Sequence, residues 1–261
     1  MNRKYALADL EPNIDTTPGL LHGTSDIVFG WTAIEIPTGA CSVKTIHAIV
    51  EGTDGAAGNT EDLFLYFARS INGVAPSTFG TENAVTVKAT TLAFRKNLLG
   101  MVHVDFSARD DGDYLRAYNV IGDRTAAGTD NAALAGEMYN IVLQGDPKYP
   151  STKGYQTIWV AGYGAGAFNF GTAVVLNEGS SANQAANMTG DSVTFTTSGT
   201  DPASCFAAGD QLIGSTGGPT MEFVSRASAT SMLVKNISEQ VDHAEELVVR
   251  NPIKLRIGLE Y

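Results

Sequence analysis

Short runs of strand-forming residues, separated by turn clusters, recur along the first two thirds of the chain. In the run 63–67, Leu63, Leu65 and Phe67 would face one side of a sheet, and the residues between them the other side. Eight such runs are recognisable, at 27–36, 43–51, 63–71, 98–106, 114–121, 139–144, 156–162 and 168–176. This spacing predicts an all-β protein whose main domain is a jelly-roll-like β-sandwich.

The composition changes after residue 176. Residues 177–252 contain no Trp or Tyr, and their first part is rich in Gly, Ser, Ala and Asn, as in a linker. Four or five short strands with short connections follow, and the segment 227–230 has the length of a hairpin loop. The segment therefore predicts a small β-barrel, near the lower end of domain sizes.

The last nine residues alternate along their whole length, with apolar or aromatic side chains at Ile253, Leu255, Ile257, Leu259 and Tyr261. A strand of this kind needs a sheet that covers its apolar face. We expect it to return to the sandwich, which makes the barrel an insertion before the last strand. A strand that only extends the barrel is the alternative. The predicted organisation is an extended N-terminal arm (1–26), a β-sandwich (27–176), a β-barrel insertion (177–252) and a C-terminal strand (253–261).

The charge balance excludes two classes of partner. The 261 residues include 17 Lys and Arg against 28 Asp and Glu, which gives a formal net charge of −11. A protein that binds duplex nucleic acid or an anionic membrane surface needs clustered cations instead. We therefore expect neither a nucleic acid nor a membrane as partner, and no apolar run approaches the ~18 residues of a spanning helix.

The sequence offers no convergent catalytic or cofactor site. Residues 162–167 fit the pattern G-x-G-x-x-A, but a strand-like segment follows where a dinucleotide site needs a helix. His103 and Asp105 would share one face of a strand and could form an acid–base pair, although a polar sheet face is the simpler interpretation. Cys41 and Cys205 are the only cysteines, and a bridge between them stays open. We predict no enzyme, no catalytic residue and no cofactor.

Acidic loops are the one candidate for a metal. Asp110, Asp111 and Asp113 surround Gly112, and a second acidic cluster lies within 54–62. Carboxylate oxygens on a turn suit Ca²⁺, but the spacing does not match the twelve-residue calcium loop. Solvated turns that use Asp and Gly for their backbone geometry are the default, so we assign no metal site and leave calcium open.

Aromatic residues raise the possibility of a carbohydrate platform. The candidates are Trp31, Trp159, Tyr163, Phe168 and Phe170. Both Trp residues lie within predicted strands beside aliphatic residues, where core packing is the ordinary use of a large ring.

The chain resembles accessory virion structural proteins of tailed double-stranded DNA bacteriophages, including head decoration or cement proteins. The resemblance rests on the general style of residues 1–176 and on the segments 5–10, 26–31, 62–68, 209–213, 222–225 and 231–234. The main shell protein of such phages would imply a long spine helix, which the sequence does not predict, so the resemblance favours an accessory subunit.

The resemblance implies a protein without catalytic activity on the outer surface of the capsid. Its partners would be the major capsid protein and copies of itself, often as a trimer. We expect the N-terminal arm to lie across a neighbour, with Tyr5, Leu7 and Leu10 as anchors, and to be removable up to residue 20 without unfolding the sandwich.

Three alternatives stay open. The chain could serve another virion role, as a jelly-roll shell, tail or connector subunit. It could be a carbohydrate-binding or adhesion module that uses Trp31, Trp159 or Tyr163. It could also be an enzyme with a site around His103 and Asp105.

Overall fold

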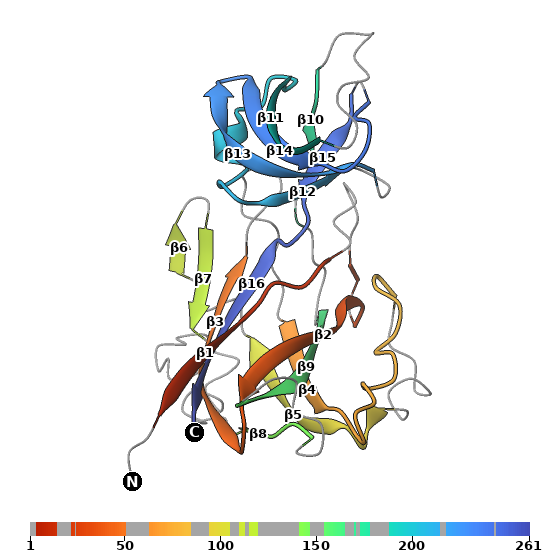
Figure 1. Ribbon diagram of the computed structural model, residues 1–261, viewed down its shortest axis with the longest axis vertical. Helices are drawn as coiled ribbons and strands as arrows, with labels where there is room; N and C mark the ends of the chain where they lie inside the picture. The colour runs from red at the N-terminus through yellow and green to blue at the C-terminus, as the bar shows by residue number, and fades with distance from the viewer. Residues whose placement is uncertain are drawn as a thin grey trace.

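The fold is all-β, with antiparallel pairing between the named strands (Figure 1). The computed structural model describes residues 4–14, 22–23, 25–50, 63–84, 94–104, 110–112, 115–119, 141–146, 154–164, 170, 173–177, 188–214, 218–242 and 244–261. The helical element named among them is the short 3₁₀ turn η1 (Pro202–Ser204), which Asp201 caps by accepting a hydrogen bond from the Ala203 amide. In this part of the chain no helix is long and apolar enough to cross a membrane.

Two sheets form the sandwich in the lower part of Figure 1. Sheet 1 contains, in spatial order, β1 (Tyr5–Leu10), β16 (Ile253–Glu260), β3 (Cys41–Val50), β7 (Leu115–Asn119) and β6 (Asp110–Gly112), and β8 (Val142–Leu143) also pairs with β3. Sheet 2 contains β2 (Ile27–Pro37), β9 (Tyr155–Gly164), β4 (Leu63–Arg69) and β5 (Leu98–Val104). The first and last strands of the chain are thus neighbours in one sheet, since β16 lies between β1 and β3.

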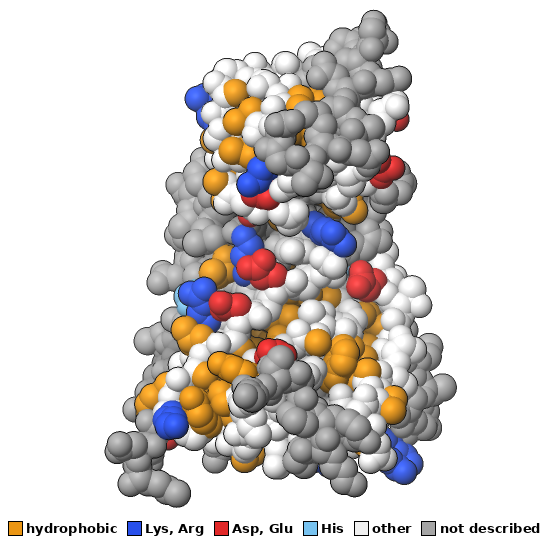
Figure 2. Space-filling view, viewed as in Figure 1, with side chains coloured by type: hydrophobic (Ala, Val, Ile, Leu, Met, Phe, Trp, Pro, Cys, Tyr) orange, Lys and Arg blue, Asp and Glu red, His pale blue; other side chains and the backbone are white. Residues whose placement is uncertain are grey.

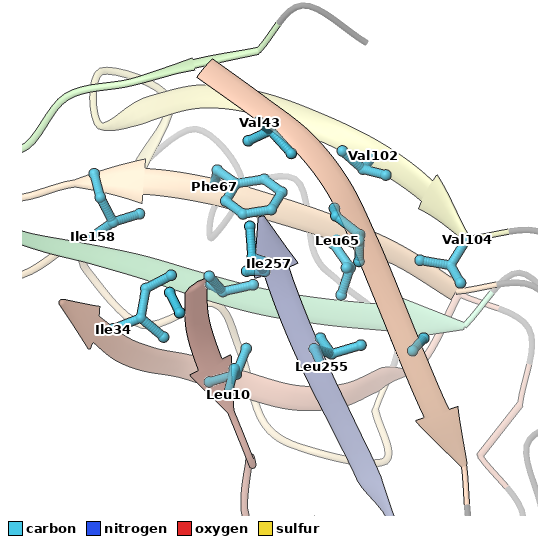
Figure 3. Close-up of a cluster of buried hydrophobic side chains, with 14 of the residues drawn as sticks. Leu10, Ile34, Val43, Leu65, Phe67, Val102, Val104, Ile158, Leu255 and Ile257 are labelled. Carbon is cyan, nitrogen blue, oxygen red and sulfur yellow. The ribbon is translucent and has the colours of Figure 1, made fainter. Parts of the chain in front are cut away.

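The alternating residues of both sheets meet in one apolar core (Figure 3). Leu65 and Phe67 of β4 are fully buried, and they face Val43 of β3 and Ile257 of β16 across the sandwich. The period-2 pattern of these strands is the cause, because every second side chain points into the space between the sheets.

A third, six-stranded sheet forms a separate unit above the sandwich. Sheet 3 contains, in spatial order, β10 (Val174–Val175), β15 (Glu246–Val249), β12 (Gln211–Gly214), β13 (Thr220–Ser228), β14 (Ser231–Ile237) and β11 (Met188–Thr196). The sheet curls, and a bridge between Leu176 and Thr197 brings its two outer strands together at one end. Val174 and Leu176 pack in the core of this unit, so it begins earlier than the predicted boundary at residue 177.

The chain passes between the two units twice, between β9 and β10 and between β15 and β16, and the second connection is well bonded. The Arg250 amide donates to the Gln211 carbonyl at 2.8 Å, and the Ile14 amide donates to the Arg250 carbonyl at 3.3 Å. Lys254 Nζ of β16 lies 3.2 Å from the buried carboxylate of Asp210. Because Lys254 belongs to sheet 1 and Asp210 precedes β12, this contact links the two units directly.

The N-terminal segment departs from the predicted free arm. Residues 5–10 form β1, which pairs in continuous antiparallel register with β16 of the same chain. Ala8, Leu10 and Ile14 are buried in the sandwich core at 6%, 2% and 5% exposure. The prediction that Leu10 anchors a neighbouring subunit is therefore wrong, because the core of its own chain already buries it.

Candidate functional site

The exposed side of β1 is the candidate interaction site. Tyr5 and Leu7 are each 68% exposed, whereas Ala8 and Leu10 of the same strand are buried. The alternation of the strand explains the difference, since odd-numbered side chains point away from the core. Two of the three predicted anchors, Tyr5 and Leu7, thus share one surface with Asp9, and Leu10 lies on the opposite face.

The backbone of β1 leaves one edge of sheet 1 open. Lys4 and Tyr261 exchange both of their backbone hydrogen bonds, at 3.1 and 3.0 Å. In an antiparallel ladder such pairs alternate with pairs that are not bonded to each other. The amide and carbonyl groups of Tyr5, Leu7 and Asp9 therefore point away from β16, and no described strand pairs with them there.

The side chains beside this edge are charged but paired. Arg256 Nε donates to Asp9 Oδ1 at 2.8 Å, and this hydrogen bond raises the pKa of Arg256. A second ion pair joins Lys44 of β3 to Glu260 of β16, with Nζ 2.8 Å from Oε2. Figure 2 shows acidic and basic side chains next to one another on the face in view.

A shallow pocket lies on the same face of sheet 1. Its volume is about 110 Å³, and its lining includes Asp9, Glu11, His47, Lys254 and Arg256. Small-molecule sites usually measure roughly 300–1,000 Å³. Arg256 and Lys254 already hold the carboxylates of Asp9 and Asp210. The pocket therefore suits water or a small group at most, and the edge is the more prominent feature.

A row of aromatic rings covers the outer face of sheet 2. Phe64 of β4 stacks on His103 of β5 at 4.6 Å and on Tyr163 of β9 at 4.9 Å. Because β4 lies between β5 and β9, the two neighbours cover opposite faces of the Phe64 ring. Burial, followed by a hydrogen bond with Tyr66, raises the pKa of Tyr163 to about 12.

The other predicted carbohydrate residues are also engaged in packing. Trp31 contacts Phe79 and Phe94 in edge-on geometry, at 5.0 and 5.3 Å. Its indole N–H donates to the Ser77 carbonyl at 2.8 Å. Trp31 is partly buried against the small core of Ile27, Phe79 and Phe94, so this cluster resembles a small second core more than a platform.

Two further aromatic candidates are placed as follows. Trp159 lies on β9, and its indole N–H donates to Ser70 Oγ at 3.1 Å. Phe170 is buried at 4% exposure, and Phe168 lies outside the described residues.

The other candidates for chemistry lie largely outside the described residues. The ring of His103 is stacked on Phe64, and Asp105 lies outside the described residues. Asp110 and Asp111 belong to β6, but their side chains and the whole of Asp113 are not described, nor is the cluster at 54–62. Within the described ranges, no three His, Cys, Asp or Glu residues gather in a way that could hold a metal ion.

The two cysteines are not bridged. Cys41 and Cys205 are both free and buried, and they belong to the cores of different units. Burial raises the pKa of the Cys41 thiol, and its Sγ lies 3.4 Å from the Pro37 carbonyl oxygen. Both cysteines are therefore core residues.

The first half of the glycine-rich motif, residues 162–164, belongs to β9. Gly162 lies inside β9, where a Cβ atom would come within 2.4 Å of the Phe29 ring. Gly162 therefore allows close packing against an aromatic core residue. Residues 165–167 of the motif lie outside the described residues.

In comparisons with protein-family models, curated proteins and solved structures, nothing matches this chain. The candidate function therefore rests on the residues and the geometry.

Proposed function

We propose that the protein is a virion structural subunit without catalytic activity, most closely a capsid decoration or cement protein of a tailed bacteriophage. It would bind the outer surface of the head and bridge neighbouring subunits of the shell. Its partners are the major capsid protein and further copies of itself, and the resemblance implies a trimer.

The strand order of the sandwich is the observation that carries this proposal. In chain order the sandwich strands are β1, β2, β3, β4, β5, β8, β9 and β16, if the hairpin of β6 and β7 is set aside. Sheet 1 then has the first strand next to the last and the last next to the third, and sheet 2 runs second, seventh, fourth, fifth. This order supports a jelly roll with sheet 3 inserted before the last strand.

Jelly rolls are frequent in viral capsid domains, but they also occur in lectins and cupins. A fold alone does not decide between these functions, so the surface must. The rings of Phe64 and Tyr163 are stacked on each other, and the pocket beside β1 is small, which disfavours a sugar or small-molecule site. The exposed Tyr5 and Leu7 favour a contact with another protein chain.

The structure changes how the N-terminal contact is proposed. In place of a free arm that lies across a neighbour, the contact is made by the outer side of β1, which remains in its own sheet. The net charge of −11 supports a place on the outside of the head, since like charge keeps the protein away from packaged DNA.

The test is sedimentation with capsid shells, assembled from the major capsid protein of the phage that encodes this chain. We expect the wild-type protein to co-sediment with the shells, and the double variant Tyr5→Ser/Leu7→Ser to bind at least about tenfold more weakly, as for the loss of one buried apolar contact. Val74→Ser is the matched control, because Val74 is also 68% exposed but lies in the turn after β4, away from β1.

Wild-type protein that stays in the supernatant at every concentration would contradict the proposal. Shell binding that tolerates the double variant would move the contact away from β1. Binding to a glycan array, weakened by Trp31→Ala or Tyr163→Ala with the fold retained, would favour the carbohydrate-binding alternative instead.

A further inference from the structure

We infer that β1 pairs edge to edge with β1 of a second copy of this chain, across a two-fold axis at Leu7. Sheet 1 would then continue from one copy into the other. This inference deepens the subunit contact of the proposed function and rests on it for the role of Tyr5 and Leu7 as contact residues. It replaces the trimer that the resemblance implies with a two-fold pair.

The backbone supplies the pairing. The amide and carbonyl groups of Tyr5, Leu7 and Asp9 point to the open edge, as the Lys4–Tyr261 bonds show. An antiparallel copy centred on Leu7 places Leu7 opposite Leu7 of the second copy, and Tyr5 opposite Asp9 of the second copy. Because the N–H and C=O groups of these residues all point toward the other copy, each facing pair would exchange two backbone hydrogen bonds.

The side chains fit the same register. On the outer face, the two exposed Leu7 side chains would cover each other, and each Tyr5 ring would lie beside an Asp9 carboxylate. On the inner face the residues nearest the axis are Ala6 and Ala8, which are small enough to let the two edges approach. The strand is therefore self-complementary about its centre.

Local charge also permits two acidic copies to meet here. Each chain carries a net charge of −11, so most of its surface disfavours association with a copy. Along this edge, however, Asp9 is neutralised by Arg256 and Glu260 by Lys44, both at 2.8 Å. Both of these carboxylates beside the shared edge are therefore paired with a cation.

The neighbouring edge of sheet 2 lacks these properties. Pairing of β2 with β9 shifts register on either side of Phe29, and the Ile27 amide and carbonyl are occupied by Ala84 and Asn83 at 3.1 and 2.9 Å. Such bulges and covering loops are common devices that prevent edge-to-edge pairing. β1 has regular register, and its six residues include neither Lys nor Pro.

The first experiment is disulfide trapping of the full-length protein under mild oxidation. Leu7→Cys should give a covalent dimer, because facing Cα atoms in such a pair are about 5.5 Å apart, within disulfide range. Tyr5→Cys is the matched control, since two copies of that residue would lie roughly 14 Å apart. A mixture of Tyr5→Cys and Asp9→Cys should cross-link again. The natural cysteines do not interfere because both are buried.

The second experiment measures mass by light scattering. The wild type should have twice the mass of the 27.5 kDa chain. Leu7→Pro should be monomeric with an unchanged circular dichroism spectrum, because the lost N–H points away from β16. Ala8→Pro should unfold the sandwich instead, since that amide faces β16.

Several outcomes would overturn the pairing: a monomeric wild type at all concentrations, a dimer or trimer that survives Leu7→Pro, or cross-linking of Tyr5→Cys as fast as Leu7→Cys. These measurements use no shells, so they separate the two proposals. A monomer that sediments with shells would refute the pairing alone, and a β1-dependent dimer that ignores shells would refute only the capsid role.

Discussion

Gly162 illustrates how one missing side chain positions the sandwich core. A Cβ atom there would lie 2.4 Å from the Phe29 ring, whereas a Cβ atom at Gly30 would meet nothing within 4 Å. We expect Gly162→Ala to lower the free energy of unfolding by about 1–3 kcal/mol through overpacking. Gly30→Ala, the control, should be neutral or stabilising by up to about 1 kcal/mol. Urea denaturation measures both, and equal effects would contradict the packing role of Gly162.

Tyr163 makes the stability of the sandwich depend on alkaline pH. Burial and the hydrogen bond with Tyr66 raise its pKa from 10.0 to about 12 in the folded chain. A raised folded pKa favours the neutral phenol, so its contribution is complete below pH 10 and is lost as the pH rises towards 12. Thermal melts between pH 8 and 12 should therefore show a steeper fall for the wild type than for Tyr163→Phe.

Tyr155→Phe serves as the control for that experiment, because Tyr155 begins the same strand but is 47% exposed. Its melting profile should follow that of the wild type. A Tyr163→Phe profile that also follows the wild type would show that another group governs the alkaline transition.

At the scale of elements, β1 is a structural strand with one exposed side. Leu10→Ala should lower the free energy of unfolding by about 2–5 kcal/mol, because it leaves a cavity in the core. Leu7→Ala should change the free energy of unfolding of the monomer by less than about 0.5 kcal/mol, because Leu7 is exposed within its own chain. Removal of residues 1–20 should unfold the sandwich, in contrast to the expectation from the sequence. Denaturant titrations test all three, and a folded deletion variant would contradict this role of β1.

The all-β fold and its antiparallel sheets could be predicted from the sequence because period-2 patterns such as 63–67 and 253–261 are local. Residues 5–10 are apolar except for Asp9 and show no such contrast, so their sequence alone predicts an arm and not a core strand. Their partner, β16, lies at the other end of the chain, and no local signal indicates such a pairing. The exposure of Tyr5 and Leu7 and the burial of Ala8 and Leu10 become visible only once this pairing is known.

The predicted boundary of the second unit, at residue 177, is wrong for a related reason. Val174 and Leu176 look like the end of a sandwich strand, and only their pairing with β15 and Thr197 assigns them to sheet 3. Cys41 and Cys205 likewise lie in two different cores. Because their positions in the sequence do not reveal this separation, the sequence alone does not decide whether they form a disulfide.

At the scale of the whole molecule, the chain has two principal cores joined by a short, well-bonded segment. The larger core fills the sandwich, and the second lies within sheet 3. The Lys254–Asp210 contact and the Arg250 backbone bonds fasten the upper unit to β16. When a partner binds the edge of sheet 1, the position of the upper unit relative to that partner is therefore determined by these contacts with β16.

The adjacent ends of the chain have a consequence for engineering. Lys4 and Tyr261 are hydrogen-bonded to each other, and both ends lie at the lower end of the sandwich (Figure 1). A short peptide could therefore connect Lys4 to Tyr261, and a circular permutant opened in the upper unit would keep β1 and β16 as neighbours. Cargo fused beside Lys4 or Tyr261 would emerge next to the same sheet edge, so a display scaffold built from this protein should carry its cargo on new ends in sheet 3.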